Sequence, residues 1–251
     1  MRKGQPAVKI GVKQKDFCVI LYEVPKVLQD RRDRMNRRTK GILIAVLAVV
    51  LLVLVFSGYG YISQKMTAND GVEYLNDKEY QKAYEKFHKA SGKFTLFWTK
   101  QKTDVLLYEG ESLYQLERYD DAIEVYDRLI DKGESRAYSF KAFCYAGKGD
   151  NGKALEVCDE GIADLPKEGS IYCTKYGILA KQEKYEEGIK ILETALKQED
   201  LNDRKEVLFT RIGAYESIFD FDQAYEYAKA FVKEYPDDKD GQKELTFLET
   251  R

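Results

Sequence analysis

The chain has one histidine and one tryptophan among its 251 residues, and its four cysteines contain no Cys-x-x-Cys pair. Structural zinc sites need several Cys or His ligands at close spacings, so the sequence predicts no zinc site. The single histidine, His88, has no evident partner that would make it a catalytic base. The motifs of serine hydrolases, zinc proteases and P-loop proteins are also missing. The sequence therefore predicts a protein that is not an enzyme and holds no cofactor.

One glycine-rich stretch, GKGDNG at residues 147–152, has the spacing G-x-G-x-x-G of dinucleotide-binding loops. That fingerprint requires a strand before it and a helix after it within a strand–helix–strand unit. The flanking sequence here is helical on both sides. We therefore interpret these glycines as the end of one helix and the turn into the next.

Proline and alternating apolar patterns are scarce after residue 64. Only Pro166 and Pro236 occur there, and no run alternates between apolar and polar residues as a half-buried strand does. The same segment is rich in Tyr, Glu, Lys, Ala and Leu. It is predicted to be helical throughout, which places the chain in the all-α class.

Charge is missing from residues 41–64 and differs in sign on either side. Residues 1–40 carry twelve Lys or Arg and four Asp or Glu, a net charge of +8. Residues 65–251 carry 29 basic and 39 acidic side chains, a net charge of −10, which would repel nucleic-acid phosphates. We expect no nucleic-acid partner, whereas the basic residues within 31–40 are suited to contact anionic lipids.

The uncharged stretch has the length of a single transmembrane helix. Its 24 residues would span about 36 Å, against about 30 Å for the hydrocarbon core of a bilayer. Thirteen of the fifteen residues from Ile42 to Phe56 are Ile, Leu, Val or Phe. They favour insertion by roughly 4 to 8 kcal/mol. We expect a signal-anchor helix over 41–63 that ends near Ser57, Gly58 and Gly60.

The flanking basic residues predict the orientation of this helix. Residues 21–40 hold seven Lys or Arg and residues 65–84 hold three. Since the more basic flank stays in the cytoplasm, the sequence predicts a single-pass cell-membrane protein with a cytoplasmic N-terminus and an extracytoplasmic C-terminal domain. A cleaved signal peptide, a buried core helix and the inverted topology are the alternatives.

The C-terminal domain contains an internal repeat. The segments EYQKAYEKFHKA, RYDDAIEVYDRL, DNGKALEVCDEG, KYEEGIKILETA and DFDQAYEYAKAF align with one another. Their anchor residues are Ala83, Ala122, Ala154, Gly188 and Ala224, at spacings of 39, 32, 34 and 36. This pattern resembles the tetratricopeptide repeat (TPR), whose unit is about 34 residues in two antiparallel helices.

The resemblance implies a solenoid of five helical hairpins over 64–237, followed by a capping helix over 238–251. Small residues would let the helices of each hairpin approach closely, and aromatic residues would fill the spaces between hairpins. The consensus small residue is replaced by Tyr176 in the fourth unit and Ile212 in the fifth. In the final helix, Leu245 and Leu248 would face inward.

Members of this family bind a peptide or partner helix in the concave groove lined by the first helices of the hairpins. The resemblance places seven candidate groove residues here: Tyr108, Glu111, Tyr114, Phe140, Phe143, Lys181 and Phe209. Their chemistry suits a peptide with apolar anchors and some positive charge. Phe140 and Phe143 are equally consistent with core positions.

These features predict a membrane-anchored adaptor or scaffold, similar in plan to membrane-anchored TPR proteins of the bacterial cell envelope. The alternative function is an assembly subunit that self-associates or braces a membrane complex without a peptide ligand.

Two details are open in the sequence. Cys144 and Cys158 fall on the two helices of one hairpin and would pair or stay reduced. The rings of Phe94, Phe97 and Trp98 would either seal the junction between the first two repeats or bind a partner.

Overall fold

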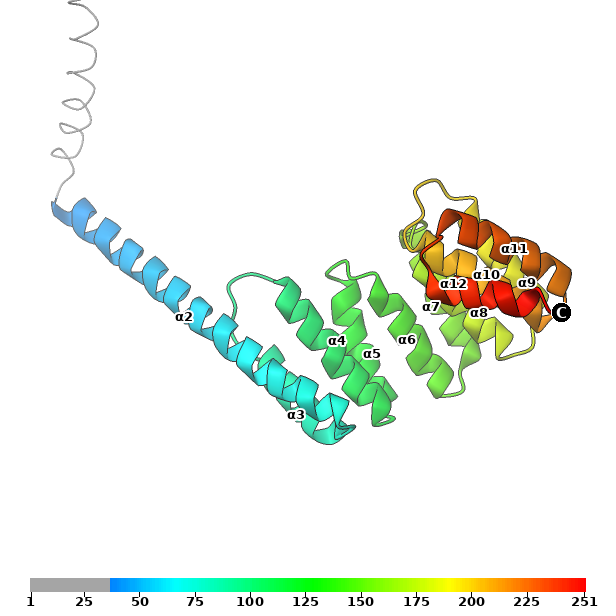
Figure 1. Cartoon of the computed structure of the whole chain (residues 1–251). Helices are drawn as coiled ribbons and strands as arrows, with labels where there is room; N and C mark the ends of the chain where they lie inside the picture. The colour runs from blue at the N-terminus through cyan, green and yellow to red at the C-terminus, as the bar shows by residue number, and fades with distance from the viewer. Residues whose placement is uncertain (1–36) are drawn as a thin grey trace, which may run out of the picture. The chain divides into compact units, whose positions relative to one another are not determined.

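The structure is a computed structural model that describes residues 37–251 (Figure 1). Residues 1–36 lie outside the described residues. They include most of the basic tail, with Cys18 and the start of the basic cluster at Arg31. The described part contains eleven helices and no strand, so the all-α prediction is confirmed. It divides into two units between residues 57 and 58, and each unit is described by itself.

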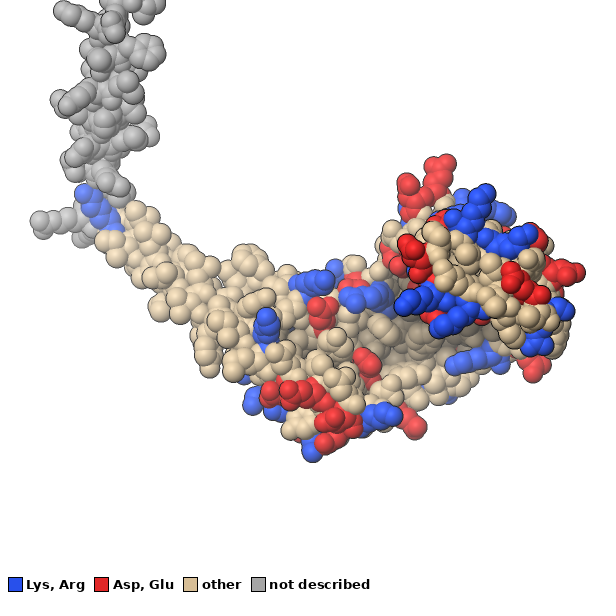
Figure 2. Space-filling view, viewed as in Figure 1, with Lys and Arg blue, Asp and Glu red and all other residues tan. Residues whose placement is uncertain are grey.

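The first helix, α2 (Arg37–Asn76), is 40 residues long and provides all of the described part of the first unit. Its most apolar 18-residue window has a mean hydropathy of 3.0 and no buried residue. Figure 2 shows no charged side chain along this part of the helix, whereas acidic and basic side chains are interspersed over the second unit. One helix in the described chain is thus long and apolar enough to cross a membrane, and it is not a covered core helix.

The expectation that this helix ends near residues 57–60 is wrong. Helix α2 continues without a break to Asn76, and its residues from Gln64 onward contribute to the first repeat. Isolated glycines cost a helix only about 1 kcal/mol each, too little to end it when later residues pack well. Gln64 provides such packing, because its buried amide donates a hydrogen bond to the Ala90 carbonyl at 3.1 Å.

The second unit is a row of helical hairpins (Figure 1). The end of α2 pairs with α3 (Tyr80–Ser91), and four further hairpins follow before a last helix. They are α4 (Lys100–Gln115) with α5 (Tyr119–Ile130), α6 (Arg136–Gly147) with α7 (Asn151–Asp164), α8 (Gly169–Ala180) with α9 (Tyr185–Leu196), α10 (Arg204–Ser217) with α11 (Phe221–Glu234), and finally α12 (Lys239–Leu248). The first helices α4, α6, α8 and α10 contact one another in order and form one layer.

Aromatic rings lie directly on small residues within the hairpins. A Cβ atom added to Gly110 of α4 would lie 2.6 Å from the ring of Tyr126 in α5, and one added to Gly71 would lie 2.8 Å from Phe87. In the fourth hairpin the two positions are exchanged. Tyr176 on the first helix packs on Gly188 of the second, at 2.7 Å from the added atom. The departure from the consensus at Tyr176 is therefore compensated within the same hairpin.

Each hairpin turn uses one residue in the left-handed backbone conformation. Only the third turn places a glycine there, Gly149 with φ +82°, within the stretch GKGDNG. The other four turns place a non-glycine residue at this position, with φ between 58° and 61°: Lys78, Glu117, Glu183 and Phe219. The structure thus places the glycine-rich stretch across the end of α6, the turn and the start of α7.

The C-terminal end is closed by α12. Leu248 is buried against Phe231 and its neighbours, and Leu245 packs against the same cluster, so the inward face is confirmed. Pro166 and Pro236 lie two residues beyond the ends of α7 and α11. Both positions agree with proline following a helix that it cannot continue.

The connection between α3 and α4 is a loop over residues 92–99. Its aromatic side chains differ in how far the rest of the domain covers them. Phe97 is 72% exposed, and Phe94, Leu96 and Trp98 are also exposed. The sealing interpretation is therefore wrong for Phe97, whereas the rings of Phe94 and Trp98 are more than half covered.

Candidate functional site

A pocket of about 300 Å³ opens on the layer formed by the first helices of the hairpins. We call it the central pocket. Its lining comes from three successive repeats: Glu111, Tyr114 and Gln115 of α4, Tyr126 of α5, Phe140 and Phe143 of α6, and Lys181 at the end of α8. Five of these residues are among the seven candidate groove residues.

Helical spacing explains why these side chains converge. Glu111, Tyr114 and Gln115 lie three and four residues apart, and Phe140 and Phe143 lie three apart, so each set projects from one face of its helix. Phe140 stacks on Tyr126 with ring centroids 5.4 Å apart and an interplanar angle of 22°. Tyr126 is buried, so it forms the floor of the pocket.

The two phenylalanines differ in burial. Phe140 is half-buried and packs against the core cluster around Leu113, so it serves both core and pocket. Phe143 is 36% exposed and belongs to no core cluster of the described chain. The alternatives of core and groove are thus divided between them, and Phe143 is the residue available to a ligand.

The pocket contains one charged group of each sign. Glu111 is half-buried, and this burial raises the pKa of its carboxyl above the ordinary value because the charged form loses solvation. Lys181 is exposed at the rim. Within residues 37–251, neither side chain takes part in an ion pair. A cationic group of a ligand beside Glu111 would form an ion pair that offsets the solvation the carboxylate has lost.

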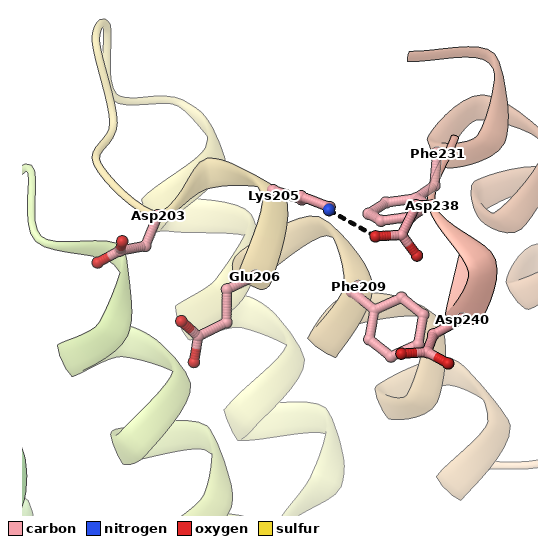
Figure 3. Close-up of a pocket in the computed structure, with 7 residues that line it drawn as sticks. All are labelled: Asp203, Lys205, Glu206, Phe209, Phe231, Asp238 and Asp240. Atoms are coloured by element: carbon pink, nitrogen blue, oxygen red, sulfur yellow. Dashed lines mark ion pairs between the residues drawn. The ribbon is translucent and has the colours of Figure 1, made fainter. Parts of the chain in front are cut away.

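Phe209 lies outside the central pocket. It is half-buried, its ring centroid lies 5.4 Å from that of Phe231, and both rings line a second pocket of about 350 Å³. Figure 3 shows Lys205 and Asp238 at this pocket, joined by an ion pair. Nζ of Lys205 lies 2.5 Å from Oδ2 of Asp238. The remaining lining residues are acidic: Asp203, Glu206 and Asp240.

Tyr108 is also separate from the central pocket. It stacks on Phe87 at 5.3 Å between centroids and lines a third pocket, formed by the end of α2 and the start of α4. The seven candidate residues therefore fall into one group of five and two individual positions.

His88 has a partner that the sequence does not reveal. Its Nδ1 lies 2.8 Å from Oε1 of Glu109, a carboxylate that is 3% exposed. The other Glu109 oxygen is buried without a hydrogen bond in the described part of the chain. The pair joins α3 to α4 and contains no nucleophile, so it provides a polar contact between two repeats.

The cysteines of the third hairpin are free. Cys144 packs in the cluster between the second and third hairpins, and Cys158 packs in the next cluster. Burial raises the pKa of both thiols to about 12. Both behave as small buried hydrophobic residues rather than as a bridge.

Sequence reasoning misses Gln115 and Tyr126 in the pocket. Tyr126 stands at a consensus apolar position, and such positions are usually covered by neighbours. The sequence does hold a signal for Tyr126, which is Gly110 sixteen residues earlier. A glycine that faces a ring lets that ring lie against the opposite helix, and here that brings Tyr126 to the pocket.

Comparisons with known proteins agree with this architecture. The family model described as tetratricopeptide repeat matches residues 107–168, from within α4 to the start of α8. A thermophilic TPR protein of Thermus thermophilus superimposes with a TM-score of 0.51 at 18% identity, covering 75% of this chain and 100% of that one. A tetratricopeptide repeat protein of Parabacteroides merdae gives 0.47 at 13% identity, covering 74% and 72%. No curated protein sequence matches the chain significantly.

The family match covers most of the second hairpin and all of the third, and the structural similarity extends the same fold over three quarters of the chain. TPR domains are protein-interaction scaffolds built from stacked hairpins, as found here. Residues 107–168 are thus tetratricopeptide repeats, and the hairpins around them share the fold of a TPR solenoid.

Proposed function

We propose that this protein is a non-enzymatic scaffold, anchored in a cell membrane by α2, that binds a protein segment in the central pocket of an extracytoplasmic TPR domain. The bound segment carries an apolar side chain and a neighbouring basic residue. Phe143 and Tyr114 would contact the apolar group, and Glu111 would pair with the basic one. Lys181 at the rim would disfavour a second positive charge on that side.

The observation that carries this proposal is the convergence of the central pocket. Side chains from three consecutive hairpins meet there, as expected when a ligand is held across the inner face of a solenoid. The half-buried Glu111 has lost solvation without gaining an ion pair in the described chain, which favours a cationic ligand. The volume of about 300 Å³ accommodates one or two side chains rather than a whole helix.

The membrane location is supported by α2 and by the distribution of charge. The apolar window of α2 has no buried residue, and the basic flank precedes it. The rule that basic flanks stay inside supports a cytoplasmic N-terminus and an extracytoplasmic TPR domain, which we assign to a cell envelope by likeness of plan. The domains proposed are a basic tail over 1–40, an anchor over 41–63, the TPR domain over 64–237 and the capping helix over 238–251.

Site-specific photo-crosslinking tests the pocket in cells. A photoreactive phenylalanine analogue at Phe143 is expected to give a discrete adduct with one partner, because this ring is exposed inside the pocket. The matched control is the same analogue at Phe219, which is 80% exposed and lies in a hairpin turn outside the pocket. Glu111→Lys should remove the adduct at position 143, since it places a cation where the ligand's cation binds.

The competing function, self-assembly without a ligand, predicts a different adduct. Crosslinks from position 143 that join two copies of this chain would support the assembly subunit and contradict the scaffold. Equal adducts from positions 143 and 219 would show that the pocket does not select a partner.

A further inference from the structure

We propose that the loop over residues 92–99 is a second membrane contact, which seats Phe94, Leu96, Phe97 and Trp98 in the lipid interface next to the anchor helix. This inference rests on the proposed membrane anchor. It adds a lipid-binding surface that holds the first repeats against the bilayer.

The loop presents a compact apolar surface. Phe97 is 72% exposed, and Phe94, Leu96 and Trp98 are between 40% and 47% exposed. They lie within the five consecutive residues 94–98, FTLFW. The surface of this unit is otherwise rich in charge. Exposed apolar clusters of this kind mark a contact with a partner or a membrane.

Both ends of the loop are fixed to α2 at Tyr61 and Gln64, within two turns or so of the end of the apolar run. Before the loop, the Ala90 carbonyl accepts a hydrogen bond from Gln64. After it, Nε2 of Gln101 donates to the Tyr61 carbonyl at 3.0 Å and to Oε1 of Gln64 at 2.9 Å. The loop is therefore tied to the stretch of α2 that leaves the proposed anchor.

The start of the loop lies against α2 at Gly60. A Cβ atom added to Gly60 would lie 1.8 Å from the Phe94 carbonyl oxygen, so only glycine permits this approach. Figure 1 shows the connection from α3 to α4 running beside α2. The contact sets the position of the start of the loop along the helix axis.

That position coincides with the expected membrane boundary. A hydrocarbon core of about 30 Å takes about 20 helical residues, which reaches Gly60 when counted from Gly41. The headgroup region extends roughly 5–8 Å further on each side. The loop, whose backbone meets α2 at Gly60, thus begins at the depth where aromatic residues concentrate in membrane proteins.

The surroundings of Trp98 fit a lipid interface better than a dry protein interface. Its Nε1 donates a hydrogen bond to Thr103 at 2.9 Å, and the ammonium groups of Lys102 and Lys132 lie 5.6 and 5.4 Å from its ring centroid. Lysine is depleted in protein–protein interfaces but is favoured beside anionic headgroups. An apolar group bordered by lysines matches the layering of a bilayer surface.

The chain offers a direct reporter, because Trp98 is its only tryptophan. The full-length protein is reconstituted into vesicles of phosphatidylcholine and phosphatidylglycerol in a three-to-one ratio, with and without lipids brominated on their acyl chains. We expect loss of Trp98 emission with brominated lipid, and a greater loss when the bromines lie near the headgroup than near the chain end. A second variant, Phe97→Trp with Trp98→Phe, should be quenched at least as strongly, since position 97 is the more exposed.

The control places the only tryptophan on α12, as Trp98→Phe with Phe247→Trp, where brominated lipid should leave the emission unchanged. Emission from Trp98 that is insensitive to brominated lipid, in protein that resists carbonate extraction, would overturn the loop inference while leaving the anchor intact. Protein that carbonate extracts from the vesicles would overturn the anchor itself. A Trp98 shielded from aqueous quencher but not reached by brominated lipid would mean that a second copy of this chain covers the loop, which also contradicts the inference.

Discussion

Two arginines in the apolar run, introduced as Val49→Arg with Leu52→Arg, are expected to release this protein from the membrane. Each exchange of an apolar residue for arginine at the centre of a span costs about 3–4 kcal/mol on an insertion scale. Two exchanges cost about 6–8 kcal/mol, which matches the roughly 4–8 kcal/mol that the whole run contributes. Both positions are exposed, so the substitutions disturb no packing within the described chain.

The matched control for this release is Met66→Arg, on the same helix but beyond the apolar run, where the side chain is also exposed. This variant should stay in the membrane fraction after carbonate extraction, while the double variant moves to the soluble fraction. If the double variant remained membrane-bound, α2 would not be the anchor. If Met66→Arg were released as well, the release would not be specific to the apolar run and would not identify it as the anchor.

Gly110→Val is expected to lower the stability of the TPR domain by about 2–3 kcal/mol through overpacking. The first carbon of the new side chain would lie 2.6 Å from Cε1 and Cζ of Tyr126, closer than unbonded carbons approach. The ring cannot retreat far, because it is buried and stacked on Phe140. Displacement would also push Tyr126 toward the central pocket, so the same variant should weaken the crosslink from position 143.

Gly177→Val is the control for this overpacking. Gly177 also lies in a first helix, but an added Cβ would meet nothing within 4 Å. Valine is slightly better than glycine in a helix interior, so this change should leave the melting temperature unchanged or raise it a little. Thermal unfolding followed by helical circular dichroism on the full chain in detergent compares the two. Equal losses for both variants would contradict the close helix packing described here.

The repeat architecture could be predicted because its determinants are local and periodic. A small residue and an aromatic ring recur at each hairpin, and prolines follow two of the second helices. The end of α2 was not predictable in the same way. Gly58 and Gly60 look like a helix end in the sequence, but what continues α2 is tertiary packing of Gln64 against Ala90.

The site was partly predictable for a related reason. Groove positions follow from the repeat register, and five of seven candidates do meet in one pocket. The register does not determine how far apart the repeats lie on the inner face. It therefore groups Tyr108 and Phe209 with five residues that line a different pocket. The contact of His88 with Glu109 depends on how α3 meets α4, which no local pattern encodes.

The central claim, a TPR domain outside the cytoplasm on a membrane anchor, is tested most directly by labelling cysteines in intact cells with a membrane-impermeant thiol reagent. Asp240→Cys places a reactive thiol on the exposed first turn of α12. The native background in the domain is low, because Cys144 and Cys158 are buried and burial raises the pKa of Cys173 to about 12. We predict labelling of Asp240→Cys without detergent, and of Cys18 only after permeabilisation. The reverse pattern would contradict the account and make this protein a cytoplasmic docking receptor.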